Sequence, residues 1–449
     1  MYSNNYFRVI LLSAFTVGCE YIFVRYINHW MYVLLACVCF IFFNIFPSFF
    51  KQPRHSLKIA SDGADLLSAF PMGIILQIIL CIFNNTVFEG NFWLPFCVFT
   101  VADLIIFWNG IIRVYLTSPI IGLKWRIIGI ICGPIPIVHL FVLFKIIKLV
   151  RFDVDTERKR FARNLQRKKE RVCATKYPIL LIHGVFFRDI RYFNYWGRIP
   201  NELEQNGATI YYGNQQSALS VAESGREIAD AIQKITDKSG YDKVNIIAHS
   251  KGGLDARYAC THLGVADKVA SLTTINTPHK GCKFADWLLK KTSPKFINTI
   301  VSAYNSTLCR FGDKNPDFLA AVQDLTAENC KILNDTTPDI ESIYYQSTSS
   351  KINKPLRNIF PLCFTNSFVK MFYGENNGLV SKKSAEWGEI CINLKTNSPE
   401  GISHADMIDL SRHNRTDFDV CEFYVELVHA LKNKGFKKTC DITKGGYNR

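Results

Sequence analysis

The sequence has no Cys-x-x-Cys pair, although it contains 15 cysteines in 449 residues. Six of them fall in the apolar first third of the chain, and the other nine are scattered over the rest. An odd number of cysteines without paired spacing is typical neither of a disulfide framework nor of a zinc site. The thiols instead indicate a reducing compartment. None of them stands beside an obvious base in the sequence, which argues against a cysteine nucleophile.

The chain also lacks the interleaved basic and aromatic residues of nucleic-acid-binding modules, so we expect no nucleic-acid partner. Its net charge of +15 belongs mostly to the front. Residues 1–176 carry 20 Lys and Arg against 9 Asp and Glu, whereas residues 177–449 carry 33 against 29. Basic residues next to apolar runs suit an anionic membrane surface.

Charged residues are rare in five apolar runs that fill the first 150 residues. A span needs about 20 mostly apolar residues. The second, fourth and fifth runs meet this requirement clearly, and the first and third only marginally; the runs are 7–24, 30–50, 66–83, 92–116 and 127–150. No small-residue cleavage pattern follows the first run, so we do not expect a signal peptide. The sequence predicts an α-helical transmembrane domain over residues 1–150.

Loop charges predict the orientation of this domain. The loops around Lys51 and Lys124 are basic, whereas residues 84–91 have no Lys or Arg, so four spans place the N-terminus in the cytoplasm. Two prolines in Gly133-Pro134-Ile135-Pro136 favour a re-entrant hairpin in the fifth run. The basic segment 151–176 then lies on the cytoplasmic side of the cell membrane, either along the headgroups or as a solvated helical linker.

One carboxylate, Asp103, lies inside the fourth apolar run. A carboxylate in a membrane span either belongs to a functional site or makes a hydrogen bond between helices. Both interpretations stay open at this point, and the second is the more common one.

A serine stands between a short apolar run and a helical pattern. The run Val244–Ala248 is typical of a buried strand, and a helix is expected from Leu254 onward. Between them lies Ala248-His249-Ser250-Lys251-Gly252, an A-x-S-x-G pattern. A nucleophile elbow needs small residues on both sides of its strained serine. The alternative is an ordinary loop in which Ser250 caps the helix.

Strands and helices alternate from residue 177 onward. Strands are expected at 178–182, 208–212, 244–248, 271–275 and 340–346. Ser220 and Glu223 form a capping-box pattern before an amphipathic helix, and another helix is expected over 420–431. Such alternation predicts a parallel sheet covered on both faces. Residues 281–339 form an insertion that is too long for an ordinary connection, so we expect either a mobile lid or a fixed helical cap.

Several segments, taken in order, resemble the bacterial triacylglycerol lipases of the α/β-hydrolase superfamily. The segments are 177–184, 248–253, 256–258, 273–281, 378–381 and 403–406. The resemblance covers about three-fifths of the chain, and residues 1–176 resemble the membrane region of some clostridial-type homologues. It implies an α/β-hydrolase domain over residues 177–449, with a helical lid near 282–339, after the transmembrane domain and the basic linker.

The resemblance also implies roles for individual residues. Ser250 would be the nucleophile and His404 the general base, because a serine hydroxyl reacts well only when a base takes its proton. The backbone N–H groups of Val185 and Lys251 would form the oxyanion hole. His249 and the motif histidine His279 would be structural.

The expected acid is missing from this constellation. The family reads Asn-Asp-Gly-Leu-Val where this chain has Asn376-Asn377-Gly378-Leu379-Val380, so Asn377 occupies the position of the acid. An amide cannot stabilise imidazolium. We expect Glu375 to supply the carboxylate; Asp406 is the alternative, or the enzyme is weak. Asp406 is a frequent calcium ligand in the family, but a partner aspartate is missing from 350–374, so we predict no metal.

The sequence thus predicts a membrane-anchored serine lipase or esterase without a cofactor. It would hydrolyse carboxylic ester bonds of acylglycerols or membrane lipids through an acyl-enzyme, next to substrates that lie in the bilayer. Two alternatives remain: a catalytically impaired domain that serves as a membrane binding or scaffold module, and a lipid acyltransferase. The oligomeric state stays open.

Overall fold

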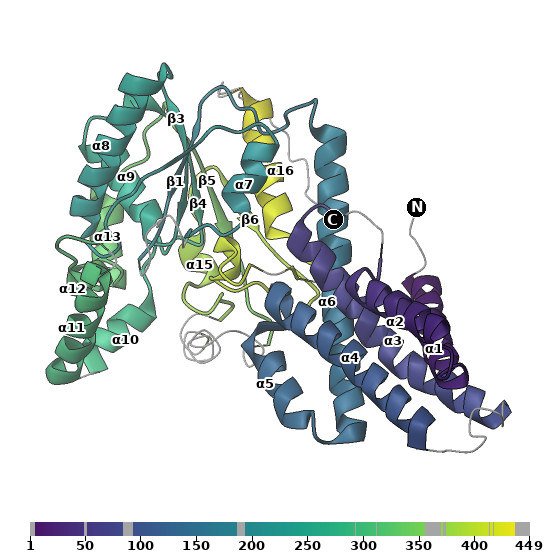
Figure 1. Ribbon diagram of the computed structural model, residues 1–449. Coiled ribbons are helices and arrows are strands. Elements are labelled where there is room, and N and C mark those ends of the chain that lie inside the picture. The colour runs from purple at the N-terminus through teal and green to yellow at the C-terminus, as the bar shows by residue number, and fades with distance from the viewer. Residues whose placement is uncertain are drawn as a thin grey trace. The chain divides into compact units, whose positions relative to one another are not determined.

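The computed structural model describes residues 5–48, 52–83, 93–185, 194–291, 293–310, 312–354, 370, 374–412, 414–415 and 417–435. The chain divides into two compact units, Met1–Leu165 and Gln166–Arg449 (Figure 1).

The first unit is helical in its described residues. Its helices are α1 Asn5–Arg25, α2 Trp30–Ile45, α3 His55–Phe83, α4 Trp93–Thr117, α5 Gly122–Cys132 and the start of α6 Pro136–Arg167. Three of the described helices are long and apolar enough to cross a bilayer: α1 from Tyr6, α3 and α4. The second run, predicted to span, forms a helix of only 16 residues, and the number of spans stays a prediction.

The fifth apolar run is interrupted where its prolines stand. Helix α5 ends at Cys132 and α6 begins at Pro136, because proline cannot continue a helix but suits its first turn. The re-entrant hairpin stays a prediction. Helix α6 runs on to Arg167, so the first part of the basic segment continues this helix.

Helices α3 and α4 approach each other closely through glycine. A Cβ added to Gly63 would lie 3.0 Å from the carbonyl oxygen of Gly110, and one added to Gly110 would lie 2.8 Å from Leu67. Small residues at such contacts allow the helix backbones to pack tightly, as they do in membrane-embedded bundles.

Three carboxylates of this unit, the buried Asp62 and Asp65 and the half-buried Asp103, have polar partners. Asp62 accepts hydrogen bonds from Ser48 (2.6 Å) and Lys58 (2.7 Å), and Asp65 is ion-paired with Arg8. Asp103 accepts a 3.3 Å hydrogen bond from Gln77 of α3, which is the helix-to-helix bond considered for it above.

The second unit is built on a six-stranded sheet in the order β2-β1-β3-β4-β5-β6, with all neighbours parallel. The strands are β1 Ile179–Ile182, β2 Ile210–Tyr212, β3 Val244–His249, β4 Val269–Ile275, β5 Tyr344–Ser349 and β6 Ile390–Asn393. Sequence patterning predicted the first five but missed β6. That strand is a four-residue edge strand with both ends exposed, so it has no continuous apolar run.

Helices cover both faces of this sheet (Figure 1). Leu180 and Ile182 of β1 pack with α8 Val221–Ser239 and α9 Gly252–His262. Ile179 and Leu181 of the same strand pack with α7 Ile199–Gln205 and α16 Val420–Lys434. Alternate residues of a strand point to opposite faces, so an unbroken apolar strand serves two layers. The predicted parallel sheet with two covered faces is confirmed.

The helix ends follow from the sequence. Ser220 and Glu223 form the predicted capping box at the start of α8, and Gly240 ends that helix with φ +74°. Gly435 likewise ends α16 with φ +56°. A left-handed residue after a helix is most easily supplied by glycine.

The long insertion between β4 and β5 is helical. It contains α10 Lys283–Lys291, α11 Pro294–Arg310, α12 Phe318–Gln323 and α13 Ala327–Thr336. Its apolar side chains, among them Leu308 and Phe318, form a cluster with Val185 and Ala218 of the sheet unit. The insertion therefore packs on the loop that follows β1.

Candidate active site

Ser250 lies at the sharp turn between β3 and α9. Its φ of +55° is in the left-handed region, which is strained for a residue with a side chain. Its N–H donates to the carbonyl oxygen of Ile275 at 2.9 Å. A Cβ on Gly252 would lie 2.3 Å from the His183 carbonyl oxygen, and one on Gly184 would lie 2.7 Å from Ser250 Cβ. Glycine at 184 and 252 therefore allows the backbones to close around the serine.

His404 lies in the loop between β6 and α16 and is buried. Its ring is 4.4 Å from the ring of His249, the residue directly before Ser250. The carboxyl ends of parallel strands meet at one edge of the sheet, so the loop after β6 can reach the turn after β3. Burial lowers the pKa of His404 to about 4, which keeps the imidazole neutral at pH 7.

His249 has a structural environment. Its Nδ1 is 2.7 Å from the hydroxyl of Tyr195, and that hydroxyl accepts a 3.1 Å hydrogen bond from the N–H of Gly184. Tyr195 thus links the loop after β1 to the residue before the nucleophile. Sequence analysis missed Tyr195, because one tyrosine outside any motif gives no pattern to detect.

Asn377 is buried next to the backbone of the candidate base. Its main-chain carbonyl accepts a 2.9 Å hydrogen bond from the N–H of His404. Its side-chain oxygen accepts hydrogen bonds from the N–H groups of Leu379 (3.2 Å) and Val380 (2.9 Å). Both donors are backbone groups of its own turn, so the carbonyl end of the amide is already engaged.

Within the described residues, the candidate base has no carboxylate partner at its buried Nδ1. Nδ1 of His404 is buried, and no atom in the described part of the chain makes a hydrogen bond to it. Desolvation is the cause of its low pKa, and no anion of the described residues opposes it. An aspartate at 377 could keep the two backbone hydrogen bonds with one oxygen and would bring a negative charge next to the backbone of His404.

Glu375, our expected acid, lies elsewhere. Its carboxylate is ion-paired with Lys351 at 2.6 Å and its side chain is 55% exposed. Lys351 also holds the pKa of Glu375 below its usual value. In the described residues it makes no hydrogen bond to His404. The structure brings Ser250, Asn377 and His404 to the carboxyl end of the sheet. It does not bring Glu375 to His404.

Asp406 is also engaged. One carboxylate oxygen is 2.8 Å from the guanidinium of Arg415, and the other accepts hydrogen bonds from the N–H and hydroxyl of Ser403, both at 2.7 Å. Arg415 also donates to the Gly401 carbonyl at 2.9 Å. Arg415 therefore bridges the two ends of the loop that carries His404. Sequence reasoning missed this arginine, which lies outside every motif.

The expected oxyanion donors lie near the serine in different elements. Lys251 is the N-cap residue of α9, where the first N–H groups of a helix have no partner within the helix. Its ammonium is buried against Asp255 (2.6 Å) and Ser224 (3.1 Å). Burial raises the pKa of Asp255 to about 7, and Lys251 opposes the shift. Val185 follows β1, beside the insertion.

No group of three or more His, Cys, Asp or Glu with metal-binding geometry occurs among the described residues. The carboxylate of Asp406, the position that the resemblance connects with calcium, is occupied by the guanidinium of Arg415.

Parts of this chain are similar in sequence to known proteins. Residues 177–310 match the family model of the alpha/beta hydrolase fold. A triacylglycerol lipase of Pseudarthrobacter phenanthrenivorans is 33% identical over 179 residues, which cover 37% of this chain and 55% of the relative. One from Burkholderia plantarii is also 33% identical and is covered to 49%. The chain thus spans about half the length of these two relatives. A triacylglycerol lipase of Pseudomonas fragi is 27% identical and is covered to 98%.

Two solved structures are similar to part of this chain. The mature lipase BlEst2 of Bacillus licheniformis is 22% identical, covers 57% of this chain and 92% of its own, and has a TM-score of 0.44. The lipase of Staphylococcus hyicus is 17% identical, with 58% and 97% covered and a TM-score of 0.46. From residue 177 onward the chain has the alpha/beta hydrolase fold, and it is a distant relative of triacylglycerol lipases.

Proposed function

We propose that the second unit is a serine hydrolase that cleaves carboxylic ester bonds of acylglycerols or membrane lipids. The observation that carries this proposal is the strained Ser250 at the turn from β3 to α9, with the buried ring of His404 4.4 Å from the ring of His249, the residue before the serine. The triacylglycerol lipases among the relatives support an ester substrate. The apolar helices of the first unit would hold the enzyme at the membrane, where such substrates are found.

The mechanism uses groups of this chain alone. Ser250 Oγ attacks the ester carbonyl while His404 takes its proton, and the N–H groups of Val185 and Lys251 stabilise the oxyanion. The C–O bond to the alcohol then breaks, and His404 gives its proton to the leaving oxygen. Water next attacks the acyl-enzyme with His404 as base, which releases the fatty acid and restores Ser250.

The triad acid determines how fast this reaction runs. The imidazolium that forms in each transition state has no carboxylate partner in the described structure. We therefore propose a slow hydrolase in which Asn377 only supports the His404 loop, and we retain Glu375 as a candidate to be tested. The missing charge also favours a second function, an impaired hydrolase domain that acts as a membrane binding or scaffold module.

Hydrolysis of p-nitrophenyl esters of graded chain length tests the proposal, with full-length protein in detergent. We expect turnover that depends on chain length and is absent from Ser250→Ala. Alanine fits the turn, so a loss of activity would not reflect unfolding, which thermal melting would verify. Equal turnover by wild type and Ser250→Ala would overturn the proposal. Product analysis with a glycerol or lipid alcohol acceptor would separate hydrolysis from acyl transfer.

A further inference from the structure

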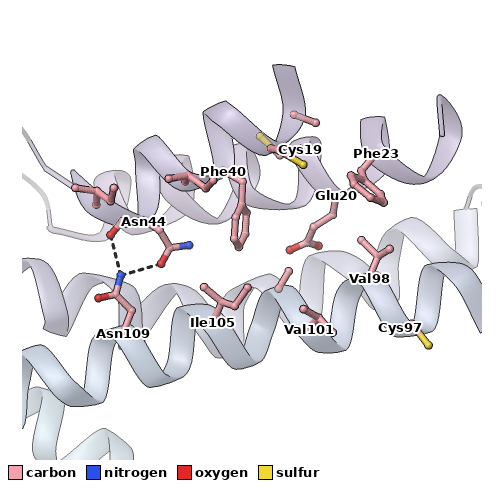
Figure 2. Close-up of a pocket in the computed structure, with 15 residues that line it drawn as sticks. Cys19, Glu20, Phe23, Phe40, Asn44, Cys97, Val98, Val101, Ile105 and Asn109 are labelled. Carbon is pink, nitrogen blue, oxygen red and sulfur yellow. Dashed lines mark hydrogen bonds between the residues drawn. The ribbon is translucent and has the colours of Figure 1, made fainter. Parts of the chain in front are cut away.

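We propose that the first unit contains a binding site for a neutral acylglycerol with a free hydroxyl group. The site is a cavity of about 640 Å³ lined by residues of α1, α2 and α4 (Figure 2). We call it the Glu20 cavity. Its walls are mostly apolar, with Phe23, Phe40, Val101 and Ile105 among them. Its volume is in the range of small-molecule sites, and its walls suit an acyl chain.

One polar group inside the cavity is left without a partner. The Glu20 side chain lines the wall, and Glu20 as a whole is 3% exposed. Its Oε2 accepts a 2.8 Å hydrogen bond from Gln77, whereas its Oε1 is buried and has no hydrogen-bond partner in the described part of the chain. Figure 2 shows the Glu20 carboxyl group between α1 and α4. An unsatisfied buried oxygen is costly, and a bound hydroxyl would satisfy it.

The other polar groups of the cavity are bonded to each other. Asn109 donates hydrogen bonds to the side-chain oxygen (3.0 Å) and main-chain oxygen (2.9 Å) of Asn44, as Figure 2 shows. Arg113, just beyond this end, donates to Asn109 at 2.9 Å and to the carbonyl of Ile45 at 3.0 Å. Among these groups of the described residues, Oε1 of Glu20 is the buried oxygen that a ligand hydroxyl can satisfy.

The charge of the cavity selects among lipids. No Lys or Arg is among its lining residues, and Glu20 is an acid. A phosphate or a fatty-acid carboxylate would be buried there without a cation among the lining residues to compensate its charge. A triacylglycerol has no hydroxyl to donate. A mono- or diacylglycerol has an acyl chain, no charge and a free hydroxyl, and so fits all three features.

This inference does not depend on the hydrolase proposal, because binding requires no catalysis. The test therefore uses full-length Ser250→Ala protein in nanodiscs and a diacylglycerol that carries a diazirine on its acyl chain. After illumination, mass spectrometry should find the label on peptides of α1, α2 or α4. Excess diacylglycerol should remove the labelling, whereas equal amounts of triacylglycerol or phosphatidylcholine should not.

Two variants of α4 form a matched pair. Val101 lines the cavity and is 55% exposed, whereas Leu104 is 50% exposed and outside it. Val101→Trp should fill the cavity and abolish the competed labelling, and Leu104→Trp should leave it unchanged. Glu20→Leu should weaken diacylglycerol competition about tenfold through the lost hydrogen bond, and Glu20→Gln, which keeps an acceptor oxygen, should largely restore it.

Equal labelling of the two tryptophan variants would overturn the proposal, as would equal competition by phosphatidylcholine or triacylglycerol. The proposal would also be refuted if the protein formed a dimer that Val101→Trp dissociates and no competed labelling were found. The cavity would then be a contact site for a second copy of the chain. Loss of ester hydrolysis by wild-type protein with the labelling intact would refute the hydrolase proposal alone.

Discussion

Replacement of Asn377 by aspartate is the most informative change to the candidate site. The new carboxylate can keep the hydrogen bonds that Oδ1 now accepts from Leu379 and Val380. We expect its second oxygen to turn toward Nδ1 of His404, which has no hydrogen-bond partner in the described structure, and to accept its proton. The main-chain hydrogen bond between His404 and Asn377 already holds the two residues together.

The magnitude follows from the cost of protonating His404. Its pKa of about 4, against about 6.5 for an ordinary histidine, means that burial disfavours the imidazolium by about 3 kcal/mol. A carboxylate would oppose that cost in each transition state. In a serine protease, the amide in place of the acid lowers kcat by about 10⁴. We therefore expect Asn377→Asp to raise kcat by up to about 10⁴-fold.

The pH profile provides a second readout. Neutral His404 is the active form, so activity is lost as pH falls through its pKa. The acid limb of the wild-type profile should lie near pH 4, and Asn377→Asp should move it to higher pH because the carboxylate favours the imidazolium. The assay is kcat for a p-nitrophenyl ester as a function of pH.

Freshly made protein and mass spectrometry of the Asn377 peptide are needed as a control, because an Asn-Gly sequence deamidates and would create aspartate in the wild type. The opposite result would support Glu375: Asn377→Asp would change little, and Glu375→Gln would lose orders of magnitude in kcat. That outcome would refute the reasoning from the Lys351 pair and the unpartnered Nδ1.

The remaining predictions concern catalysis, loop support, metal and topology. His404→Ala should lose as much esterase activity as Ser250→Ala, because nucleophile and base act as a unit; substantial activity in either would remove that residue from its role. Arg415→Met should lower kcat by more than it changes KM, and it should lower the melting temperature, because it frees both ends of the His404 loop. Arg415→Lys should recover part of the kcat and part of the melting temperature. Chelation by EDTA should leave activity unchanged, because Arg415 already pairs with Asp406; a loss reversed by calcium would contradict this. A membrane-impermeant thiol reagent should not label Cys309 in intact cells if the hydrolase unit is cytoplasmic. Cys309 is exposed, whereas Cys173 is buried and would stay unlabelled on either side.

Local patterns predicted most of the hydrolase fold. The buried strands before Ser250 and at Ile179–Ile182 are unbroken apolar runs, and the capping box at Ser220 specifies a helix start. Strand β6 was missed because an edge strand needs no apolar continuity. The second apolar run was judged by its composition, whereas its helix stops after 16 residues. Composition does not determine where a helix ends.

Tertiary partners could not be predicted from the sequence. The distance along the chain from Asp406 to Arg415, or from Glu20 to Gln77, carries no signal of contact. Glu375 was chosen as the acid because it stands two residues from Asn377, but neighbours in a loop can point in opposite directions. Its carboxylate lies on Lys351 at the surface. The buried environment of His404 likewise emerges only when the sheet brings distant loops together.

The central claim is that Ser250 is a nucleophile activated by His404. A fluorophosphonate probe tests it most directly, because the probe reacts covalently only with an activated serine. After brief exposure of freshly purified full-length protein, peptide mass spectrometry should find the adduct on Ser250. It should find none in Ser250→Ala and much less in His404→Ala. The absence of an adduct on Ser250 in folded wild-type protein, or equal labelling of His404→Ala, would contradict the claim.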